Sequence, residues 1–185
     1  MGIHAAVSAR PAVFLDRDGV LNAAVVRAGR PYPPASVDAV EILPGVANAL
    51  AELRRAGFAL VVVTNQPDVA RGNQTRAGID AIHAHLQAVL PLDAIYGCFH
   101  DDADHCACRK PAPGLLLDAA RDLGLDLARS YMVGDRWRDT EAGAAAGCRT
   151  VFIDYGYAER QPQAFDAKVS SLAEAAAWIL RGGVT

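Results

Sequence analysis

The 185-residue sequence lacks the charge excess and the long apolar segments that mark several classes of protein. Its 18 Lys and Arg against 21 Asp and Glu give a net charge of −3, without any block of five like charges. This excludes the basic surface that attracts nucleic acids or anionic membranes, so we expect neither as a partner. The most apolar stretch, residues 58–63, is far shorter than the roughly 18 residues of a membrane-spanning helix.

The sequence also lacks the features of a leader, a repeat or a flexible linker. Residues 1–11 do not combine a cationic segment with an apolar one, so we expect no signal peptide and a cytoplasmic protein. Apolar residues make up 52% of the chain, which argues against disorder. The length suits one domain with a sizeable core. We therefore predict a single domain over residues 1–185, and we expect a monomer.

Short apolar runs alternate with segments of helical periodicity along the chain. The runs predict about five strands, at residues 12–15, 58–63, 94–98, 131–133 and 150–153. The segments between and after them predict helices at residues 44–56, 75–90, 113–123, 140–146 and 171–180. Strands that are separated by helices form a parallel sheet with helices on both faces, so the fold class is α/β with three layers.

Polar residues follow the ends of the predicted strands. They are Asp16, Asp18, Thr64, Asn65 and Asp135. In open α/β sheets, ligands bind beyond the carboxyl ends of the strands. We therefore expect these five side chains to converge on one site.

The strongest chemical signal is the sequence Asp16-Arg17-Asp18-Gly19 after the first strand. Two carboxylates at this spacing can act on one reacting centre, because one can attack while the other transfers a proton. The alternative is an Asp-rich turn with Gly19 at a positive φ angle. The rest of the chain favours chemistry, since hydroxyl, ammonium and carboxylate groups follow in an order that suits a phosphoryl group and Mg²⁺. Those groups belong to Thr64, Lys110, Asp135 and Asp139.

Four motifs, LDRDG, VVVTN, the Lys of CRKP and VGDRWRD, together resemble the haloacid dehalogenase superfamily of phosphotransferases. The resemblance covers roughly residues 12–155 and implies a Rossmann-like fold. It implies a magnesium-dependent phosphatase in which Asp16 forms an aspartyl-phosphate and Asp18 is the acid and base. The implied phosphate ligands are Thr64 and Lys110, and the implied magnesium ligands are Asp16, Asp18 through its carbonyl, and Asp135. Asn65 and Arg109 are further candidate substrate-binding residues. For Asp139 a water-mediated metal contact and a purely structural role both remain open.

A second constellation places three cysteines and a histidine in a loop at about residues 98–108. Three thiolates and one imidazole match the ligand set of a structural zinc site, so we predict Zn²⁺ here. The ligands are Cys98, His100, Cys106 and Cys108. The alternative is a set of reduced loop cysteines, whereas Cys148 lies apart and is expected to be a small buried residue. Because Arg109 and Lys110 follow directly, zinc would also fix two cations at the phosphate site.

The run CxHx₅CxCRKPxPG resembles the subgroup of this superfamily that contains heptose bisphosphate and histidinol-phosphate phosphatases. The resemblance implies a small phosphate ester as substrate, and we expect a heptose 1,7-bisphosphate that is cleaved at C7, with histidinol phosphate as the alternative. Arg71 or Arg109 can meet a second phosphate. Asp68 departs from the small residues usual at its position, and it can reject a phosphate, attract an amine or simply occupy a solvated turn.

The subgroup resemblance also implies a fold without a large cap domain, so loops must select the substrate. The candidates are residues 22–36, residues 66–74 and the zinc loop, and the Pro-rich stretch 29–36 is expected to border the pocket. Two other functions are a binding protein without catalysis and a phosphotransferase. The intact Asp16 and Asp18 argue against the first, and the lack of spare length for a water-excluding cap argues against the second.

Overall fold

The computed structural model describes residues 9–183, which leaves most of the segment inspected for a signal peptide, and the two ends of the predicted domain, outside the described residues. A parallel sheet of six strands forms its centre, in the order β5-β4-β1-β6-β7-β8. The strands are β1 (Arg10–Leu15), β4 (Ala59–Asn65), β5 (Ala94–Cys98), β6 (Leu125–Gly134), β7 (Arg149–Ile153) and β8 (Ala167–Val169). Five of them contain the predicted apolar runs, and the α/β class is confirmed.

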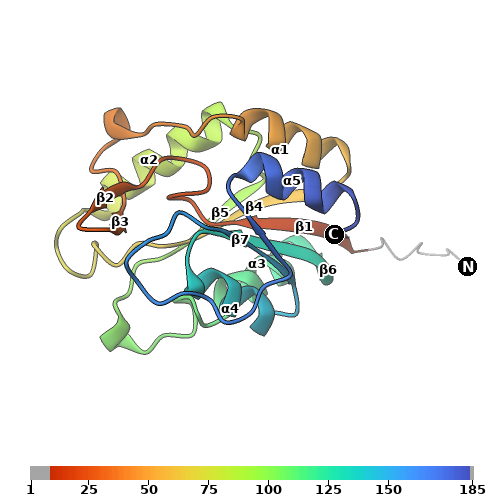
Figure 1. Cartoon of the computed structure of the whole chain (residues 1–185). Helices are drawn as coiled ribbons and strands as arrows, with labels where there is room; N and C mark the ends of the chain where they lie inside the picture. Colours follow the sequence, from red (N-terminus) through yellow and green to blue (C-terminus); the bar gives the residue numbers. More distant parts are fainter. Residues whose placement is uncertain (1–8, 184–185) are drawn as a thin grey trace, which may run out of the picture.

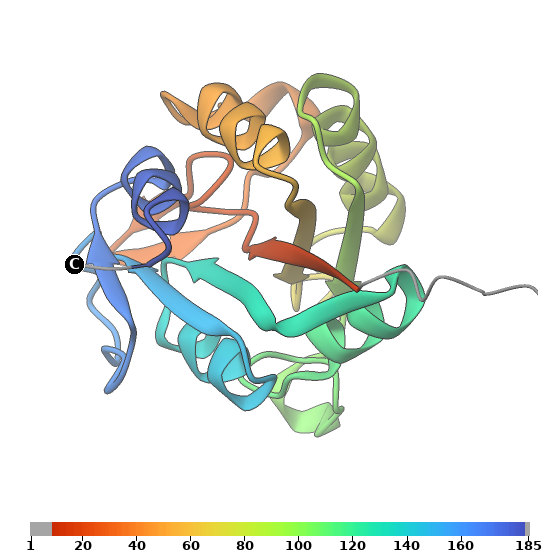
Figure 2. The ribbon, with the colours of Figure 1, turned by 90° about the vertical axis from the view of Figure 1, so that its right-hand side faces the viewer.

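Helices cover both faces of the sheet, which gives the three predicted layers (Figure 1). One face carries α1 (Val46–Arg55), α2 (Arg76–Val89) and α5 (Leu172–Leu180). The other carries α3 (Gly114–Leu123) and α4 (Trp137–Ala145). Figure 2 shows the sheet between the two layers.

The strands are apolar on both faces because each face packs against helices. In β1, Val13 and Leu15 join the core beneath α1, α2 and α5, whereas Ala12 and Phe14 join the core beneath α3 and α4. Successive side chains of a strand point to opposite faces, so continuous apolar runs are needed to fill both cores. This is why the central strands could be read from the sequence.

Two elements begin earlier than predicted. α4 begins at Trp137, because the carboxylate of Asp139 accepts a hydrogen bond from the backbone N–H of Arg136 at 3.0 Å and closes the first turn. β6 begins at Leu125, and its register with β1 shifts where the hydroxyl of Ser130 accepts the N–H of Ala12 at 2.8 Å. The polar residues before Tyr131 conceal this longer strand in the sequence.

A small antiparallel hairpin, which the sequence did not predict, lies between β1 and α1. Its strands are β2 (Val25–Arg27) and β3 (Arg30–Tyr32). Ala28 and Gly29 form the turn with φ angles of 48° and 74°, as in the two-residue turns that match strand twist. The predicted Pro-rich loop at 29–36 therefore starts as a strand. No helix within residues 9–183 is long and apolar enough to cross a membrane.

Candidate active site

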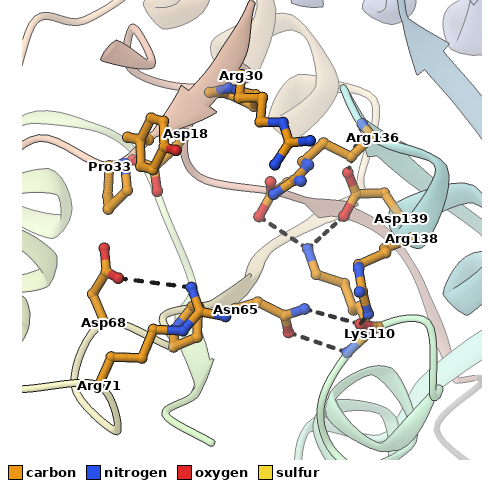
Figure 3. Close-up of a pocket in the computed structure, with 14 residues that line it drawn as sticks. Asp18, Arg30, Pro33, Asn65, Asp68, Arg71, Lys110, Arg136, Arg138 and Asp139 are labelled. Carbon is orange, nitrogen blue, oxygen red and sulfur yellow. Dashed lines mark hydrogen bonds and ion pairs between the residues drawn. The ribbon is translucent and has the colours of Figure 1, made fainter. Parts of the chain in front are cut away.

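The carboxyl ends of β1, β4 and β6 meet at a pocket with a cavity volume of about 230 Å³ (Figure 3). Two of the loops predicted to select the substrate border it, those around residues 30–33 and 67–71. The residues that line it are Asp16, Asp18, Arg30, Pro31, Tyr32, Pro33, Asn65, Pro67, Asp68, Arg71, Lys110, Arg136, Arg138 and Asp139. Side chains from distant parts of the sequence thus converge at the sheet edge, as parallel topology requires.

A buried lysine forms the centre of the site. The ammonium of Lys110 donates to Asp16 Oδ1 at 2.9 Å, to Asp139 Oδ1 at 2.6 Å and to the carbonyl of Val63 at 2.7 Å. Burial alone would lower the pKa of Lys110, but the carboxylates of Asp139 and Asp16 raise it above its usual value. Lys110 is therefore a fixed cation that partly neutralises two acidic side chains.

For the pKa of Asp16, in contrast, burial outweighs the effect of the neighbouring cation. Burial, together with the nearby charges of Asp139 and Asp18, raises its pKa to about 6, against the lowering effect of Lys110. A second cation beside Asp16 would favour its ionised form, which is the form that can attack an electrophile.

A metal ion fits beside this carboxylate. Ligand oxygens of Asp16, Asp135 and Asp139 lie within 4.8 Å of one another. Both carboxylate oxygens of Asp135 are buried without a hydrogen-bond partner among the described residues, and burial with the charges of Asp16 and Asp139 raises its pKa well above normal. Clustered hard oxygens that lack donors suit Mg²⁺. Gly19 permits this packing, since a Cβ there would lie 1.9 Å from Asp135 Oδ2.

The carboxylate of Asp18 is held by donors on every side. Arg17 donates to its two oxygens at 3.1 and 2.9 Å, Asn22 donates at 2.9 Å, and Gln66 donates at 3.0 Å. Arg17, Asn22 and Gln66 are completely buried. Asp18 is therefore oriented by rigid partners and still reaches the pocket.

The two predicted site residues at the end of β4 have different positions. Asn65 lines the pocket and exchanges two hydrogen bonds with the backbone of Lys110, at 3.0 and 3.1 Å. Thr64 is buried, and its hydroxyl accepts from Gln66 at 2.9 Å. Asn65 thus fixes the Lys110 segment, while the phosphate contact of Thr64 stays a prediction.

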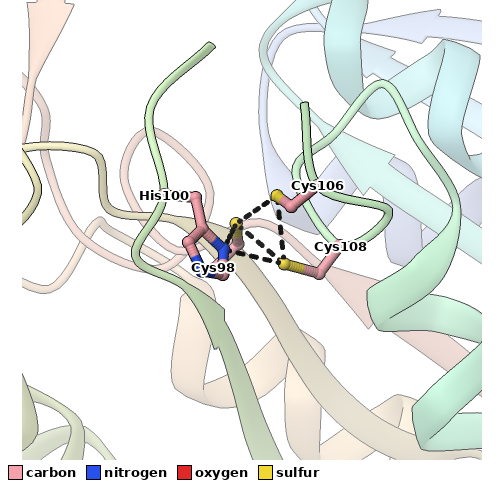
Figure 4. Close-up of side chains that lie close together, drawn as sticks. All are labelled: Cys98, His100, Cys106 and Cys108. Atoms are coloured by element: carbon pink, nitrogen blue, oxygen red, sulfur yellow. Dashed lines mark hydrogen bonds between the residues drawn. The ribbon is translucent and has the colours of Figure 1, made fainter. Parts of the chain in front are cut away.

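The four predicted zinc ligands point toward one another (Figure 4). Their donor atoms lie within 4.8 Å of one another, with sulfur separations of 3.0 to 3.6 Å and the imidazole Nδ1 of His100 3.4 Å from the sulfur of Cys108. All four cysteines are free, and Cys148 is buried apart from the cluster. One zinc ion, with bonds to sulfur of about 2.3 Å, suits such a donor set.

Acidic residues of the zinc loop pair with arginines around the pocket. Asp101 accepts two hydrogen bonds from Arg71, at 2.6 and 2.7 Å, which together with a backbone N–H lower its pKa to about 2. Asp102 pairs with Arg109 at 2.8 Å and with Arg138 at 3.1 Å. In the described part of the chain Arg109, like Thr64, is not among the residues that line the pocket, whereas Asn65 and Lys110 are.

Sequence reasoning missed three arginines of the pocket, of which Arg138 pairs with Asp102. Arg136 lies in the GDRWRD motif and pairs with Glu159, and Arg30 comes from the unpredicted hairpin. The Pro-rich stretch pointed to the neighbourhood of Arg30 without singling it out. Asp139, whose role the sequence left open, contacts Lys110 and belongs to the carboxylate cluster.

Comparison with known proteins agrees with this geometry. A family model for hydrolases of the haloacid dehalogenase-like type matches residues 31–147. The chain therefore belongs to the haloacid dehalogenase-like hydrolases.

Its relatives within that family carry a more specific name. The D-glycero-beta-D-manno-heptose-1,7-bisphosphate 7-phosphatase of Salmonella typhi is 42% identical over 152 residues, which is 76% of this chain and 78% of that protein. The crystal structure of D,D-heptose 1,7-bisphosphate phosphatase from B. bronchiseptica, complexed with magnesium and phosphate, matches with a TM-score of 0.76 at 34% identity, covering 93% of this chain and 99% of the other. The enzyme of that name from Burkholderia thailandensis matches with a TM-score of 0.64 at 28% identity, covering 92% and 99%.

Proposed function

We propose that this protein is a magnesium-dependent phosphomonoesterase that works through an aspartyl-phosphate. A carboxylate oxygen of Asp16 attacks the phosphorus of the ester, and the bond from phosphorus to the leaving oxygen breaks. Water then attacks the phosphorus of the aspartyl-phosphate, which releases inorganic phosphate and restores the carboxylate. The observation that carries this proposal is the buried group of Asp16, Lys110, Asp135 and Asp139 at the strand ends.

Asp18 is the proposed acid and base. When protonated, it donates a proton to the leaving alkoxide, and its carboxylate later accepts a proton from the attacking water. The hydrogen bonds from Arg17, Asn22 and Gln66 fix the orientation of this carboxylate.

Lys110 and the bound metal would both offset negative charge in the site. Asp16, Asp135 and the backbone carbonyl of Asp18 would hold Mg²⁺, with Asp139 near enough to join through water. Bound Mg²⁺ would offset the repulsion between an anionic carboxylate and an anionic phosphate. The three N–H donors of Lys110 already contact Asp16, Asp139 and the carbonyl of Val63. Lys110 therefore supplies a fixed positive charge beside the phosphate, and it must release one of these contacts to donate to a phosphate oxygen.

The proposed substrate is a heptose 1,7-bisphosphate that is cleaved at C7. Relatives at 42% identity over three quarters of the chain carry that activity in their names. The pocket supports a substrate with two anionic groups, because Lys110 and four arginines line it.

Histidinol phosphate remains the second candidate because of Asp68. Asp68 lines the pocket with its carboxylate 3.9 Å from Arg71, so it can meet a cationic amine. The other acids considered for this role are already engaged, since Asp101 and Asp102 pair with arginines and Asp104 accepts the N–H of Asp101. This distribution of charge favours the bisphosphate.

The zinc cluster has a proposed structural role. Zinc at Cys98, His100, Cys106 and Cys108 would fix the loop that leads directly to Lys110. Zinc thiolates also suit the reducing cytoplasm that we propose as the location. We further propose one domain over the whole chain and a monomer in solution, which sedimentation would test.

A phosphate-release screen over a panel of phosphomonoesters tests the function. We expect the heptose 1,7-bisphosphate to have the highest kcat/KM, and EDTA followed by added Mg²⁺ to abolish and restore turnover. A higher kcat/KM for histidinol phosphate would reverse the choice of substrate. Full activity of a metal-free enzyme would contradict the mechanism.

A further inference from the structure

Five cationic side chains line the pocket, and all but one of them have an anionic partner. Lys110 pairs with Asp16 and Asp139, and the partners of the arginines come from the zinc loop and the segment after β7. The arginine pairs are Arg71 with Asp101, Arg136 with Glu159, and Arg138 with Asp102. Within residues 9–183, Arg30 makes no ion pair or side-chain hydrogen bond, although it points into the pocket from β3 (Figure 3).

The hairpin that carries Arg30 is fastened to the body of the protein at both ends. The carbonyl of Gly29 accepts the N–H of Ala158 at 2.8 Å, and the carbonyl of Pro34 accepts from the side chain of Gln74 at 2.8 Å. A Cβ at Gly29 would lie 2.8 Å from the Cβ of Ala158, so the turn is in close contact with the neighbouring segment. The backbone of Arg30 is therefore held in place over the pocket, which lowers the entropic cost of using its guanidinium in recognition.

A bisphosphate needs a cation of this kind. When one phosphate lies at Asp16 and Lys110, the other lies near the pocket rim and is partly removed from water. This desolvation costs free energy unless a hydrogen-bond donor replaces the lost hydration. A guanidinium with no carboxylate partner can give both charge and paired N–H donors without first breaking an ion pair. The remaining pocket arginines would each have to give up a carboxylate.

We propose that Arg30 binds the phosphate that is not transferred and so determines the preference for a bisphosphate over a monophosphate. This inference rests on the proposed function. It replaces Arg109, which pairs with Asp102 outside the pocket lining, and Arg71, which is bound by Asp101, as the recognition residue.

The test compares Arg30→Ala with Arg27→Ala on two substrates, heptose 1,7-bisphosphate and p-nitrophenyl phosphate. Arg27 is a matched control, because it is the cross-strand neighbour of Arg30 in the same hairpin but does not line the pocket. We expect Arg30→Ala to lower kcat/KM for the bisphosphate about 10- to 100-fold more than for p-nitrophenyl phosphate, mainly through KM. Arg27→Ala should leave the ratio of the two substrates at its wild-type value.

Binding to the inactive Asp16→Asn protein gives a second measurement. Calorimetric titration with the bisphosphate should show a Kd at least tenfold weaker after Arg30→Ala is added, with no comparable change for inorganic phosphate. Equal losses for both substrates, or an unchanged Kd, would overturn the assignment of Arg30 while the wild-type preference for the bisphosphate stood. If the wild-type enzyme cleaved p-nitrophenyl phosphate but not the bisphosphate, the proposed substrate and the role of Arg30 would both be wrong.

Discussion

The carboxylate cluster and the thiol cluster lie at the same end of the sheet, but they are held together differently. Asp16, Asp135 and Asp139 are buried at strand ends or on a helix, and Lys110 supplies a cation among them. The thiol cluster instead joins two segments of one loop, and three of its four residues are partly exposed or exposed. The carboxylate cluster contains the cation of Lys110, whereas the thiol cluster consists of metal-ligating atoms that face one another without a cationic side chain among them.

The difference predicts separate roles for the two metals. The carboxylates keep their geometry through Lys110 and the sheet, so Mg²⁺ can exchange without unfolding the site. Thiolates at 3.0 to 3.6 Å repel one another unless an ion or protons intervene, so zinc would hold the loop itself. Variants that affect one cluster alone test whether the two metals have these separate roles.

The largest expected effect is on turnover. Asp16→Asn should lower kcat by about 10³-fold or more, because the amide is a poor nucleophile although its shape is preserved. Circular dichroism and zinc content should match the wild type, since β1 and the thiol loop are untouched. Wild-type phosphate release by the purified variant would disprove Asp16 as the nucleophile.

Lys110→Met should affect both activity and stability. It leaves Asp16 and Asp139 buried without their cation, and breaking a buried pair in this way costs about 3–5 kcal/mol of unfolding free energy. Urea unfolding in magnesium-free buffer measures this loss, and added Mg²⁺ should recover part of it. Lys168→Met is the control, because Lys168 is the other lysine of the chain and pairs with Asp154 at an exposed site. A stability loss equal to that control would show that Lys110 does not stabilise the cluster.

The zinc cluster should respond to Cys106→Ser. We expect metal analysis to fall from about one zinc per chain to well below one, with kcat/KM lowered about 10- to 100-fold because the loop no longer places Lys110 accurately. Cys148→Ala should keep the zinc, since Cys148 is buried away from the other thiols. An active wild-type protein without zinc, in which all four thiols titrate, would refute the site.

Features that are determined by residues close together in the sequence could be predicted. Apolar runs revealed the central strands because both of their faces are buried, and the spacing of the thiol loop revealed its cluster because the ligands are close in sequence. β8 was missed, since its three residues include Lys168 and only Ala167 is buried. The hairpin was missed because Pro31 lies in a strand and its turn is Ala28-Gly29.

Pairing between distant segments could not be predicted from the sequence. Arg109 and Arg71 are in the expected loops, yet their guanidinium groups turn to Asp102 and Asp101, and the sequence does not show which of the neighbouring acids each arginine selects. Among residues 9–183, Arg30 is recognised as the pocket cation without an ion pair only after the partners of the other pocket arginines are known. Arg30 therefore emerges from the three-dimensional distribution of charge.

The smallest expected effect is on the pH dependence of stability, and it involves His83 on α2, which belongs to neither cluster. His83 is buried, its Nε2 lacks a partner among the described residues, and burial together with the charge of Arg17 lowers its pKa from 6.5 to about 4, against the opposite effect of Asp80 and Asp18. The folded protein disfavours the protonated ring, so the stability from neutral His83 is complete above pH 6.5 and is lost as the pH falls toward 4.

This linkage should lower the unfolding free energy by at most about 2 kcal/mol between pH 7 and pH 5. His83→Gln removes the titrating group, so the loss of stability over this interval should be smaller in the variant than in the wild type. Urea unfolding of both proteins at pH 7 and pH 5 measures the difference, and protonation of the zinc ligands cancels because it is common to both. Equal pH dependence in the two proteins would show that His83 does not contribute to acid sensitivity, which would then come from other titrating groups.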